Sequence, residues 1–377
     1  MKIALIRRKY DALGGGAEKY MHNVSVGLLQ RGHELTLFAE RVSNLPAGLE
    51  WVPVPKPRIP SLCSAAAFHK AAQRAVSKRH FDVVYALCRT WPSDLLRVTE
   101  QIHAAWLPIR YSAFARLNPR HRGIIQLEKQ SLSSRHTRYV VTNSELVKRQ
   151  IVSLFGYPGD RVFVIRNGVD HDEFFPPPSP ALRLSARQGL GVRPDKIVLL
   201  FAAANFRIKG LDSALSAIAR IPGEIRSRVV MVVVGGDKPD RYLLQAKQLA
   251  LDSQVIFLGK CREMRSLYWA ADLLFYPSLY EPFANVCLEA CACGLPVLTT
   301  ALNGSSELIV NGRNGHVVRD SDALMEMSGF LGEFASFSTE RRAEFSQAAI
   351  EAAQALSWTR HLDGLEMLFA RLLSDKA

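Results

Sequence analysis

Residues 278–297 read SLYEPFANVCLEACACGLPV, and this stretch decides more about the fold than any other part of the chain. It follows an apolar run, Ala271–Tyr276, that has the composition of a buried strand. Pro282 and its aromatic neighbours favour a tight turn, and a helical pattern follows. The sequence therefore predicts a strand, a turn and a helix N-terminus, which is the repeating unit of a doubly wound α/β domain.

Two glutamates of this stretch, Glu281 in the turn and Glu289 in the helix, lie eight positions apart. The first backbone N–H groups of a helix have no partner within the helix, and together with the positive end of the helix dipole they favour an anion beyond the strand's carboxyl edge. A phosphate fits there, and the two carboxylates accept hydrogen bonds from hydroxyl groups. The pattern predicts a site for a nucleotide sugar.

Four further motifs occur along the chain, and with the Glu-x7-Glu spacing they resemble the markers of the retaining glycosyltransferases of family 4. They are GGGAE at 14–18, VIRNGVD at 164–170, FRIKGL at 206–211 and GSSE at 304–307. Because five motifs occur in the expected order over almost the whole chain, the resemblance is specific, whereas a single Gly-rich turn would be weak evidence.

Short apolar strands alternate with helical patterns over residues 1–175, as expected of a parallel sheet with helices on its faces. The run FPPPSP at 175–180 predicts a stiff linker, after which the alternation restarts. The resemblance implies the GT-B fold, in which two doubly wound Rossmann-like domains face a central cleft. We expect an acceptor-binding domain over 1–175, a nucleotide-sugar-binding domain over 176–356, and a helix over 357–377 that crosses back to the first domain.

The composition is that of a globular protein, since 48% of the 377 residues are hydrophobic and can form a core in each of two domains. No stretch approaches the ~20 apolar residues that a membrane-spanning helix needs. The first residues lead into a strand at Ile3–Ile6 without the pattern of a signal peptide. We therefore expect a cytoplasmic protein.

The net charge of +13 is distributed unevenly. Residues 1–180 hold 26 Lys and Arg against 14 Asp and Glu, whereas the remainder holds 22 against 21. Cations alternate with aromatic residues between 106 and 138, which suits peripheral docking on the anionic inner face of the cell membrane or an acidic acceptor; a solvated basic face is the alternative. The candidate surface consists of Arg110, Arg116, Arg120 and Arg122 with Trp106. No nucleic-acid-binding motif occurs, so we expect no nucleic-acid partner.

Transfer of a sugar from a nucleotide diphosphate needs cations that stabilise the leaving diphosphate. Lys209 precedes a glycine at a predicted helix start, and the resemblance implies that it contacts the donor diphosphate. Arg207 is the predicted second cation, with an exposed loop cation as the alternative. The commonest family pattern has an arginine where this chain has Ala204. The Phe-Arg-x-Lys-Gly spacing instead resembles the branch that glucosylates the inner core of lipopolysaccharide.

The resemblance also implies roles for the turn and helix that hold the two glutamates. Glu289 would bind the ribose hydroxyls and Glu281 would lie beside the transferred sugar. The amides of Phe283, Ala284 and Asn285 would hold the hydroxyls of that sugar, and the methyl group of Ala284, where glycine is usual, is expected to narrow the pocket. The alternatives are a solvated turn position for Glu281 and an exposed helix position for Glu289. An unpaired carboxylate among the apolar neighbours of Glu289 would be unfavourable, which favours a ligand there.

In the first domain, Gly15 and Gly16 stand between a predicted strand and helix and repeat the anion-binding corner, with a simple tight turn as the alternative. His103 occupies a position where many relatives carry an active-site histidine. The resemblance implies that it binds the sugar rather than acting as a catalytic base, and plain packing is the alternative. Asp94 and Arg97 are weaker candidates nearby.

No Asp-x-Asp motif adjoins the predicted diphosphate site, so we expect no essential metal and no cofactor besides the donor, for which the resemblance implies UDP-glucose. Cys287, Cys291 and Cys293 have no second Cys/His pair at ligand spacing nearby, so buried free thiols are favoured over zinc. The predicted function is retaining transfer of a hexose to a lipopolysaccharide core or another lipid-linked glycan acceptor. A nucleotide-sugar 2-epimerase of the same double fold is the alternative.

Overall fold

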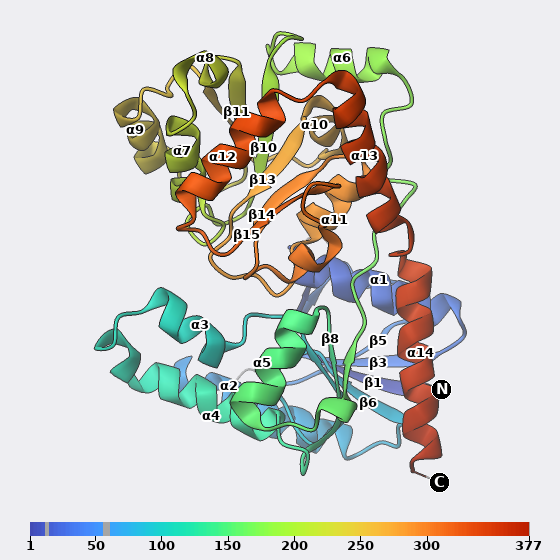
Figure 1. Ribbon diagram of the computed structural model, residues 1–377. Coiled ribbons are helices and arrows are strands. Elements are labelled where there is room, and N and C mark those ends of the chain that lie inside the picture. The colour runs from blue at the N-terminus through green and yellow to red at the C-terminus, as the bar shows by residue number, and fades with distance from the viewer. Residues whose placement is uncertain (12–14, 56–60, 377) are drawn as a thin grey trace. The chain divides into compact units, whose positions relative to one another are not determined.

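The computed structural model describes residues 1–11, 15–55 and 61–376 (Figure 1). The chain divides into two compact units: unit 1 comprises Met1–Gly168 and Leu356–Ala377, and unit 2 comprises Val169–Ala355. The division thus falls before the proline run rather than within it. Each unit is an α/β domain with its own sheet and core.

Unit 1 contains a seven-stranded parallel sheet in the order β5-β3-β1-β6-β7-β8-β9, and a separate parallel pair, β2 and β4. The strands are β1 (Lys2–Ile6), β2 (Lys9–Asp11), β3 (Glu34–Ala39), β4 (Arg41–Ser43), β5 (Glu50–Pro53), β6 (Val83–Ala86), β7 (Ser93–Val98), β8 (Thr137–Thr142) and β9 (Val162–Val164). The large sheet grows from β1 toward β5 on one side and from β6 toward β9 on the other. The strand order reverses between β1 and β6, and ligands bind at such switch points in open α/β sheets.

Helices cover both faces of this sheet. Residues of α1 (Gly16–Gln30) and α14 (Trp358–Ser374) share one core with the strands, while α2 (Ser61–Val76) and α5 (Glu145–Phe155) contribute to the cores formed with the alternate strand residues. The helices α3 (His103–Arg110) and α4 (Pro119–Ser131) lie side by side and are joined through η1 (Ala115–Leu117) (Figure 1).

The C-terminal helix belongs to unit 1, which confirms the predicted return of the chain to the first domain. In Figure 1, α14 runs beside α1, and its apolar face, including Leu365 and Phe369, is fully buried. Gly27 of α1 allows the close approach, because a Cβ there would collide with Leu362. At the polar rim of the same contact, His33 Nε2 lies 2.7 Å from Glu366 Oε1.

Unit 2 contains a six-stranded parallel sheet in the order β12-β11-β10-β13-β14-β15. The strands are β10 (Ile197–Ala202), β11 (Val229–Val234), β12 (Val255–Gly259), β13 (Leu273–Tyr276), β14 (Val297–Thr300) and β15 (Gly315–Val318). All six residues of β10 are buried, as expected for a central strand covered on both faces. Here the strand order reverses between β10 and β13.

The helices of unit 2 also pack on both sides of the strands. Residues of α7 (Leu211–Ala219), α9 (Asp240–Gln248) and α12 (Leu324–Ala335) share the main core, and α8 (Gly223–Arg226) lies against α12. Two helices, α10 (Arg265–Ala270) and α11 (Asn285–Ala292), contact the strands β10, β13 and β14. The helices α6 (Pro180–Gly189) and α13 (Thr339–Gln354) pack on α10 and α11 respectively.

The proline run differs from the predicted stiff linker. Pro180 begins α6, since proline at the first helical position lacks only an N–H that would be unbonded in any case. Trp269 Nε1 donates to the carbonyl oxygen of Phe175 at 2.7 Å, and the two rings pack with their centroids 5.6 Å apart. Both ends of the run are therefore part of unit 2.

Strand β7 was not predicted because Asp94 and Arg97 interrupt its apolar pattern. Both side chains bond within unit 1: Asp94 Oδ2 accepts from the Val84 amide at 2.7 Å, and Arg97 Nη2 donates to Asn167 Oδ1 at 2.8 Å. The two weaker site candidates thus have structural partners. Among the described residues, no helix is both long and apolar enough to cross a membrane.

Candidate active site

An ion pair stands at the switch point of unit 2. Lys209 follows β10 and Glu281 follows β13, so neighbouring strands bring these two residues to the same edge of the sheet. Their side chains form an ion pair and are only 17% and 16% exposed. Glu281 is therefore not a solvated turn residue, and the two residues that the sequence assigned to the diphosphate and the sugar lie in contact.

Gly210 makes this contact possible. Its φ of 82° lies in the left-handed region, and a Cβ at this position would collide with the carbonyl oxygen of Pro277. The amide of Leu279 also donates to the carbonyl oxygen of Ile208 at 3.0 Å. Because the two loops are held this closely, Lys209 is brought into contact with the Glu281 carboxylate.

The electrostatics of Lys209 follow from its burial. Removal of the ammonium group from water lowers its pKa to about 8, while the nearby Cys287 thiol acts in the opposite direction. The lysine is thus charged at neutral pH but has little solvent around it. Such a cation interacts strongly with any anion that enters, because little water screens it.

Glu289 has a partner from the protein. The hydroxyl of Tyr268, on α10, donates to Glu289 Oε2 at 2.8 Å, and burial raises the pKa of Tyr268 well above its usual value. The carboxylate is half-buried rather than exposed. The sequence favoured a ligand as the partner of this carboxylate, and the structure shows that Tyr268 also partners it. The sequence of residues 278–297 could not indicate this contact, because Tyr268 lies on a different helix.

One of the three amides predicted to hold the sugar has a partner within the protein. The Ala284 amide donates to Asn303 Oδ1 at 3.3 Å, within the protein. Asn303 is fully buried, also accepts from the Ser305 amide at 3.1 Å, and donates to Thr299 Oγ1 at 3.0 Å. The amides of Phe283 and Asn285 remain predicted sugar contacts.

The GSSE motif supports the loop that carries Glu281. The Gly304 amide donates to the Glu281 carbonyl oxygen at 2.8 Å, and the Glu281 amide donates to the Leu302 carbonyl oxygen at 2.9 Å. The 3-10 turn η3 (Gly304–Leu308) follows directly. Asn303 and this turn thus brace the Glu281 loop from behind, a role that the sequence did not indicate.

The end of β11 is a further part of this edge. Gly235 follows β11, and a Cβ there would collide with the carbonyl oxygen of Ala203 after β10. Two residues on, Asp237 Oδ2 accepts from the Phe206 amide at 2.9 Å. Phe206 is buried, whereas Arg207 beside it is exposed on the turn. The Gly-Gly-Asp sequence after an apolar strand could have signalled this loop.

The anion-binding turn predicted at Gly15 and Gly16 in unit 1 is exposed, whereas the Lys209–Glu281 pair of unit 2 is largely buried. Gly15 is the N-cap of α1, and Gly16 is its first residue; both are exposed. The φ of Gly15 is −74° and a Cβ would meet nothing closer than 3.6 Å, so the protein's own packing does not require glycine here. The first turn carries Glu18, which accepts from Arg7 Nη2 at 3.3 Å. Gly14 lies outside the described residues.

His103 begins α3 and is held by Glu128 of α4, which accepts from the amides of His103 and Ala104 at 2.7 and 3.1 Å. Its Nε2 lies 2.9 Å from His121 Nδ1. Burial, together with the nearby His121 and the cations Arg89 and Arg120, lowers the pKa of His103 to about 4. The ring is therefore neutral at neutral pH and has a hydrogen-bond partner in the protein.

The cysteines of α11 and its C-cap are free and buried, as the sequence indicated. Burial raises the pKa of the Cys287, Cys291 and Cys293 thiols, that of Cys291 to about 12. Cys261 is also free but exposed. Within the described residues, His, Cys, Asp and Glu side chains form no group of three or more that could hold a metal ion.

Two family models match consecutive parts of the chain. The model described as Glycosyltransferase Family 4 matches residues 14–173, and the one described as Glycosyl transferases group 1 matches residues 183–351. The chain belongs to these glycosyltransferases and is a transferase with the GT-B fold.

Relatives along nearly the whole chain agree with this assignment. The D-inositol 3-phosphate glycosyltransferase of Mycolicibacterium smegmatis is 27% identical, with 96% of this chain and 87% of the relative covered. The lipopolysaccharide glucosyltransferase WaaG of Escherichia coli is 24% identical, with 88% of each chain covered.

Solved structures show the same fold. A crystal structure of WaaG covers 97% of this chain and 99% of its own, with a TM-score of 0.83 and 22% identity. That of Anabaena Alr3699/HepE in complex with UDP-glucose covers all of both chains, with a TM-score of 0.74 and 20% identity. Within the glycosyltransferases, the chain thus resembles lipopolysaccharide-core enzymes, as the Phe-Arg-x-Lys-Gly spacing indicated.

Proposed function

We propose that this transferase moves glucose from UDP-glucose, with retention of configuration, to a lipopolysaccharide core or another lipid-linked glycan acceptor. The observation that carries the proposal is the buried Lys209–Glu281 pair at the switch point of unit 2. It joins a group that neutralises a leaving diphosphate to a group that accepts hydrogen bonds from a sugar. WaaG is a lipopolysaccharide glucosyltransferase and HepE was solved in complex with UDP-glucose, and both likenesses support glucose and UDP as the donor's parts.

In this proposal the donor diphosphate competes with Glu281 for the Lys209 ammonium. Lys209 and the exposed Arg207 donate to the phosphate oxygens as the bond between the anomeric carbon and the diphosphate lengthens, which stabilises the charge that develops there. Glu281 then accepts from a hydroxyl of the transferred sugar, and Glu289, oriented by Tyr268, accepts from the ribose hydroxyls. The acceptor's proton passes to an oxygen of the donor phosphate.

Unit 1 binds the acceptor in this scheme. His103, neutral at neutral pH, can donate and accept hydrogen bonds at the same time, which suits a sugar hydroxyl and not proton abstraction. Its role is therefore proposed as binding.

A donor panel tests the reaction. Purified protein is incubated with UDP-glucose, UDP-galactose, UDP-GlcNAc or GDP-mannose and a lipopolysaccharide-core acceptor, and nucleotide release is measured. UDP release from UDP-glucose together with an α-linked product, identified by NMR, supports the proposal. A donor epimerised at C2 without any acceptor would instead identify the 2-epimerase, and release from GDP-mannose alone would overturn the assignment of the donor.

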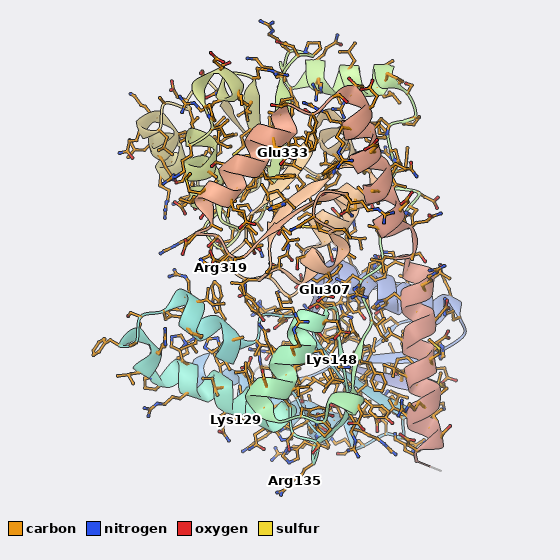
Figure 2. All side chains as sticks on the ribbon, viewed as in Figure 1. Lys129, Arg135, Lys148, Glu307, Arg319 and Glu333 are labelled. Carbon is orange, nitrogen blue, oxygen red and sulfur yellow. The ribbon has the colours of Figure 1, made fainter. Side chains whose placement is uncertain are left out.

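We also propose that unit 1 docks on the anionic inner face of the cell membrane. Phe114 and Leu117, in and beside η1, are 85% and 59% exposed, and Arg116, Arg120 and Arg122 around them are exposed as well. Figure 2 shows Lys129 and Arg135 further along the same basic segment, where both are exposed. Exposed apolar side chains surrounded by cations suit insertion into a layer of anionic lipid headgroups.

One residue of the predicted surface is corrected. Trp106 of α3 is only 7% exposed, so Phe114 and Leu117 replace it as the apolar contacts. Sedimentation with vesicles tests the docking: binding is expected to need anionic lipid and to weaken as salt shortens the Debye length to ~3 Å at 1 M. Reversal of Arg110, Arg116, Arg120 and Arg122 to glutamate should abolish it. Equal binding to neutral vesicles would contradict the proposal.

A further inference from the structure

A cavity of about 590 Å³ lies at the amino edge of the unit 2 sheet. Residues that directly precede four strands line it: Arg228 before β11, Lys196 before β10, Asp272 before β13 and Pro296 before β14. These strands are parallel neighbours, so their amino ends share one edge. Lys209 and Glu281 follow the carboxyl ends of β10 and β13, at the opposite edge. The cavity is therefore separate from the candidate active site, and its volume is that of a small-molecule site.

Two helices add arginines to this wall. Arg183 and Arg187 come from α6, and Arg342 comes from α13. The side chain of Arg187 is only 6% exposed, whereas those of Arg183 and Arg342 are 36% and 24% exposed. Arg187 is thus a buried structural cation, while the other two guanidinium groups are also accessible to a ligand.

The three arginines share one carboxylate, that of the buried Asp272. Its Oδ1 accepts from Arg183 Nη2 at 2.6 Å, and its Oδ2 accepts from Arg187 Nη2 at 2.6 Å. Arg342 Nη1 lies 3.8 Å from Oδ1, and the Val198 amide donates to Oδ2 at 2.7 Å. Both oxygens of Asp272 are therefore engaged, and a single negative charge stands against three positive ones.

The cavity keeps an excess of positive charge after its acids are counted. Its wall holds five cations and two carboxylates: Arg183, Arg187, Lys196, Arg228 and Arg342, with Asp195 and Asp272. Asp195 is itself paired with Arg193, which does not line the cavity. In the part of the chain that the structure describes, neither Lys196 nor Arg228 forms an ion pair with a carboxylate.

Backbone contacts do not remove this excess. Arg187 donates to the Ala270 carbonyl oxygen at the end of α10, and Arg342 donates to the Ala335 carbonyl oxygen at the end of α12. Lys196 Nζ donates to the Ser227 carbonyl oxygen at 2.7 Å. Carbonyl groups have no net charge, and a helix C-terminus offsets only about half a unit charge. The wall therefore remains positive.

The cations also act on one another. Burial lowers the pKa of Arg183, and the charges of Arg187 and Arg342 act in the same direction, against the effect of Asp272. Burial lowers the pKa of Arg342 as well, with Arg228 and Arg187 acting in the same direction. These arginines are thus close enough to repel one another, and an anion in the cavity would relieve the repulsion.

The rest of the wall suits the body of an organic phosphate. Apolar and hydroxyl side chains complete it: Pro177, Pro194, Trp269, Leu295, Pro296, Phe337, Thr339 and Ser346. The apolar groups can cover a ring, and the hydroxyls can donate to anionic oxygens. Planar guanidinium forks pair best with phosphate or carboxylate oxygens.

We propose that this cavity binds a phosphate-bearing small molecule with two or more negative charges, held by Arg183, Lys196, Arg228 and Arg342. Phosphate is preferred over a carboxylate because several cations around one cavity match a multivalent anion better than a single charge. The site goes beyond the proposed function, since the donor phosphates belong to the opposite edge of the sheet.

Calorimetric titration tests the inference. Pyrophosphate is titrated into the full-length protein with saturating UDP present, so that the donor diphosphate site is occupied, and acetate serves as the carboxylate probe. Pyrophosphate is expected to bind at least about tenfold more tightly than acetate and to weaken with added salt. Equal affinities for the two probes, or no pyrophosphate binding, would overturn the inference.

Two organic phosphates identify the source of the phosphate group. ADP and ribose 5-phosphate are titrated under the same conditions. Tighter binding of ADP supports a nucleotide as the ligand, and tighter binding of ribose 5-phosphate supports a sugar phosphate. Failure of both to bind would overturn the assignment to an organic phosphate.

Variants locate the binding. Arg228→Gln removes an exposed cation without leaving a carboxylate unpaired, and is expected to weaken pyrophosphate binding about fivefold. Arg228→Gln combined with Lys196→Gln should weaken it about twentyfold. Arg220→Gln, an exposed arginine of unit 2 that does not line this cavity, is the matched control and should change nothing. Unchanged pyrophosphate affinity in the first two variants would overturn the assignment of the cavity.

UDP titration separates this site from the donor site. UDP is titrated alone into the wild-type protein and into the double variant Arg228→Gln with Lys196→Gln, and its affinity is expected to be equal in both. If the double variant weakens UDP and pyrophosphate binding alike, both ligands use one site and the inference fails. If UDP does not bind at all while pyrophosphate binds and responds to Arg228→Gln, the proposed function fails and the anion site stands.

Discussion

The two switch points of this molecule have the same topology and different chemistry. In unit 2, a single lysine and a single glutamate face each other, and both are largely buried. In unit 1, Arg7, Arg8, Lys9 and Arg89 line a cavity, and each of the three arginines is paired with a glutamate. Since the sheets are built alike, the loops after the strands alone decide what each edge can bind.

The two units therefore differ in how their cations are paired with acids. The lysine of unit 2 has little water around it and is compensated by an acid that a ligand can displace. In unit 1, Arg8 and Arg89 are paired with the buried acids Glu40 and Glu128. The arrangement in unit 2 suits a leaving group whose charge changes during reaction.

The largest effect is expected at the ion pair. Lys209→Ala should reduce kcat/KM for UDP-glucose by about 10²–10³-fold, because the leaving diphosphate loses its buried cation. Nucleotide release measures this, and Lys247→Ala, an exposed lysine of α9, is the matched control. Because the change leaves Glu281 without its partner, the double variant with Glu281→Gln separates stability from catalysis: it should restore the melting temperature and not the rate. Near-normal turnover in Lys209→Ala would show that the leaving diphosphate does not depend on this lysine.

The next effect concerns the carboxylate on α11. Glu289→Ala should raise KM for UDP-glucose by tens of fold, while Tyr268→Phe should raise it only about fivefold, because it removes the group that orients the carboxylate. The double variant should lose no more than Glu289→Ala alone, since the tyrosine acts through the glutamate. Additive losses would show that Tyr268 contributes by another route.

The pH dependence sharpens the contrast between the two edges. Because burial lowers the pKa of Lys209 to about 8, the free enzyme holds the charged form below that pH and loses it above. The value of kcat/KM should therefore be flat near pH 7 and fall by up to about tenfold by pH 9. Lys209→Arg should remove this decline, since arginine stays charged. A flat wild-type profile over this range would contradict the low pKa.

The smallest effect is expected from metal removal. Lys209 and Arg207 supply the positive charge at the diphosphate in the proposed mechanism, so activity in EDTA should stay within about twofold of that with added magnesium. Rates are compared after dialysis against chelator. A complete loss that manganese or magnesium reverses would show that the cations of unit 2 are insufficient by themselves.

The sequence by itself determined the class of the enzyme and most of the fold. Apolar runs such as Ile197–Ala202 and the helical pattern of α14 are local signals, because each depends only on neighbouring residues. The ordered motifs carried the positions of Lys209 and Glu281, since a strand, a turn and a helix start always present the loop at the same edge.

Only the tertiary structure decided which groups meet at each edge. Tyr268 reaches Glu289 from another helix, Asn303 takes the Ala284 amide, and Arg89 is held by an acid from α4. These contacts join residues that are distant in the sequence, so no local pattern reports them. The same reason explains Trp106, whose basic neighbourhood predicted exposure while the packing of α3 buries it. A side chain's burial and partners depend on what the fold brings beside it, and that information lies in the whole chain at once.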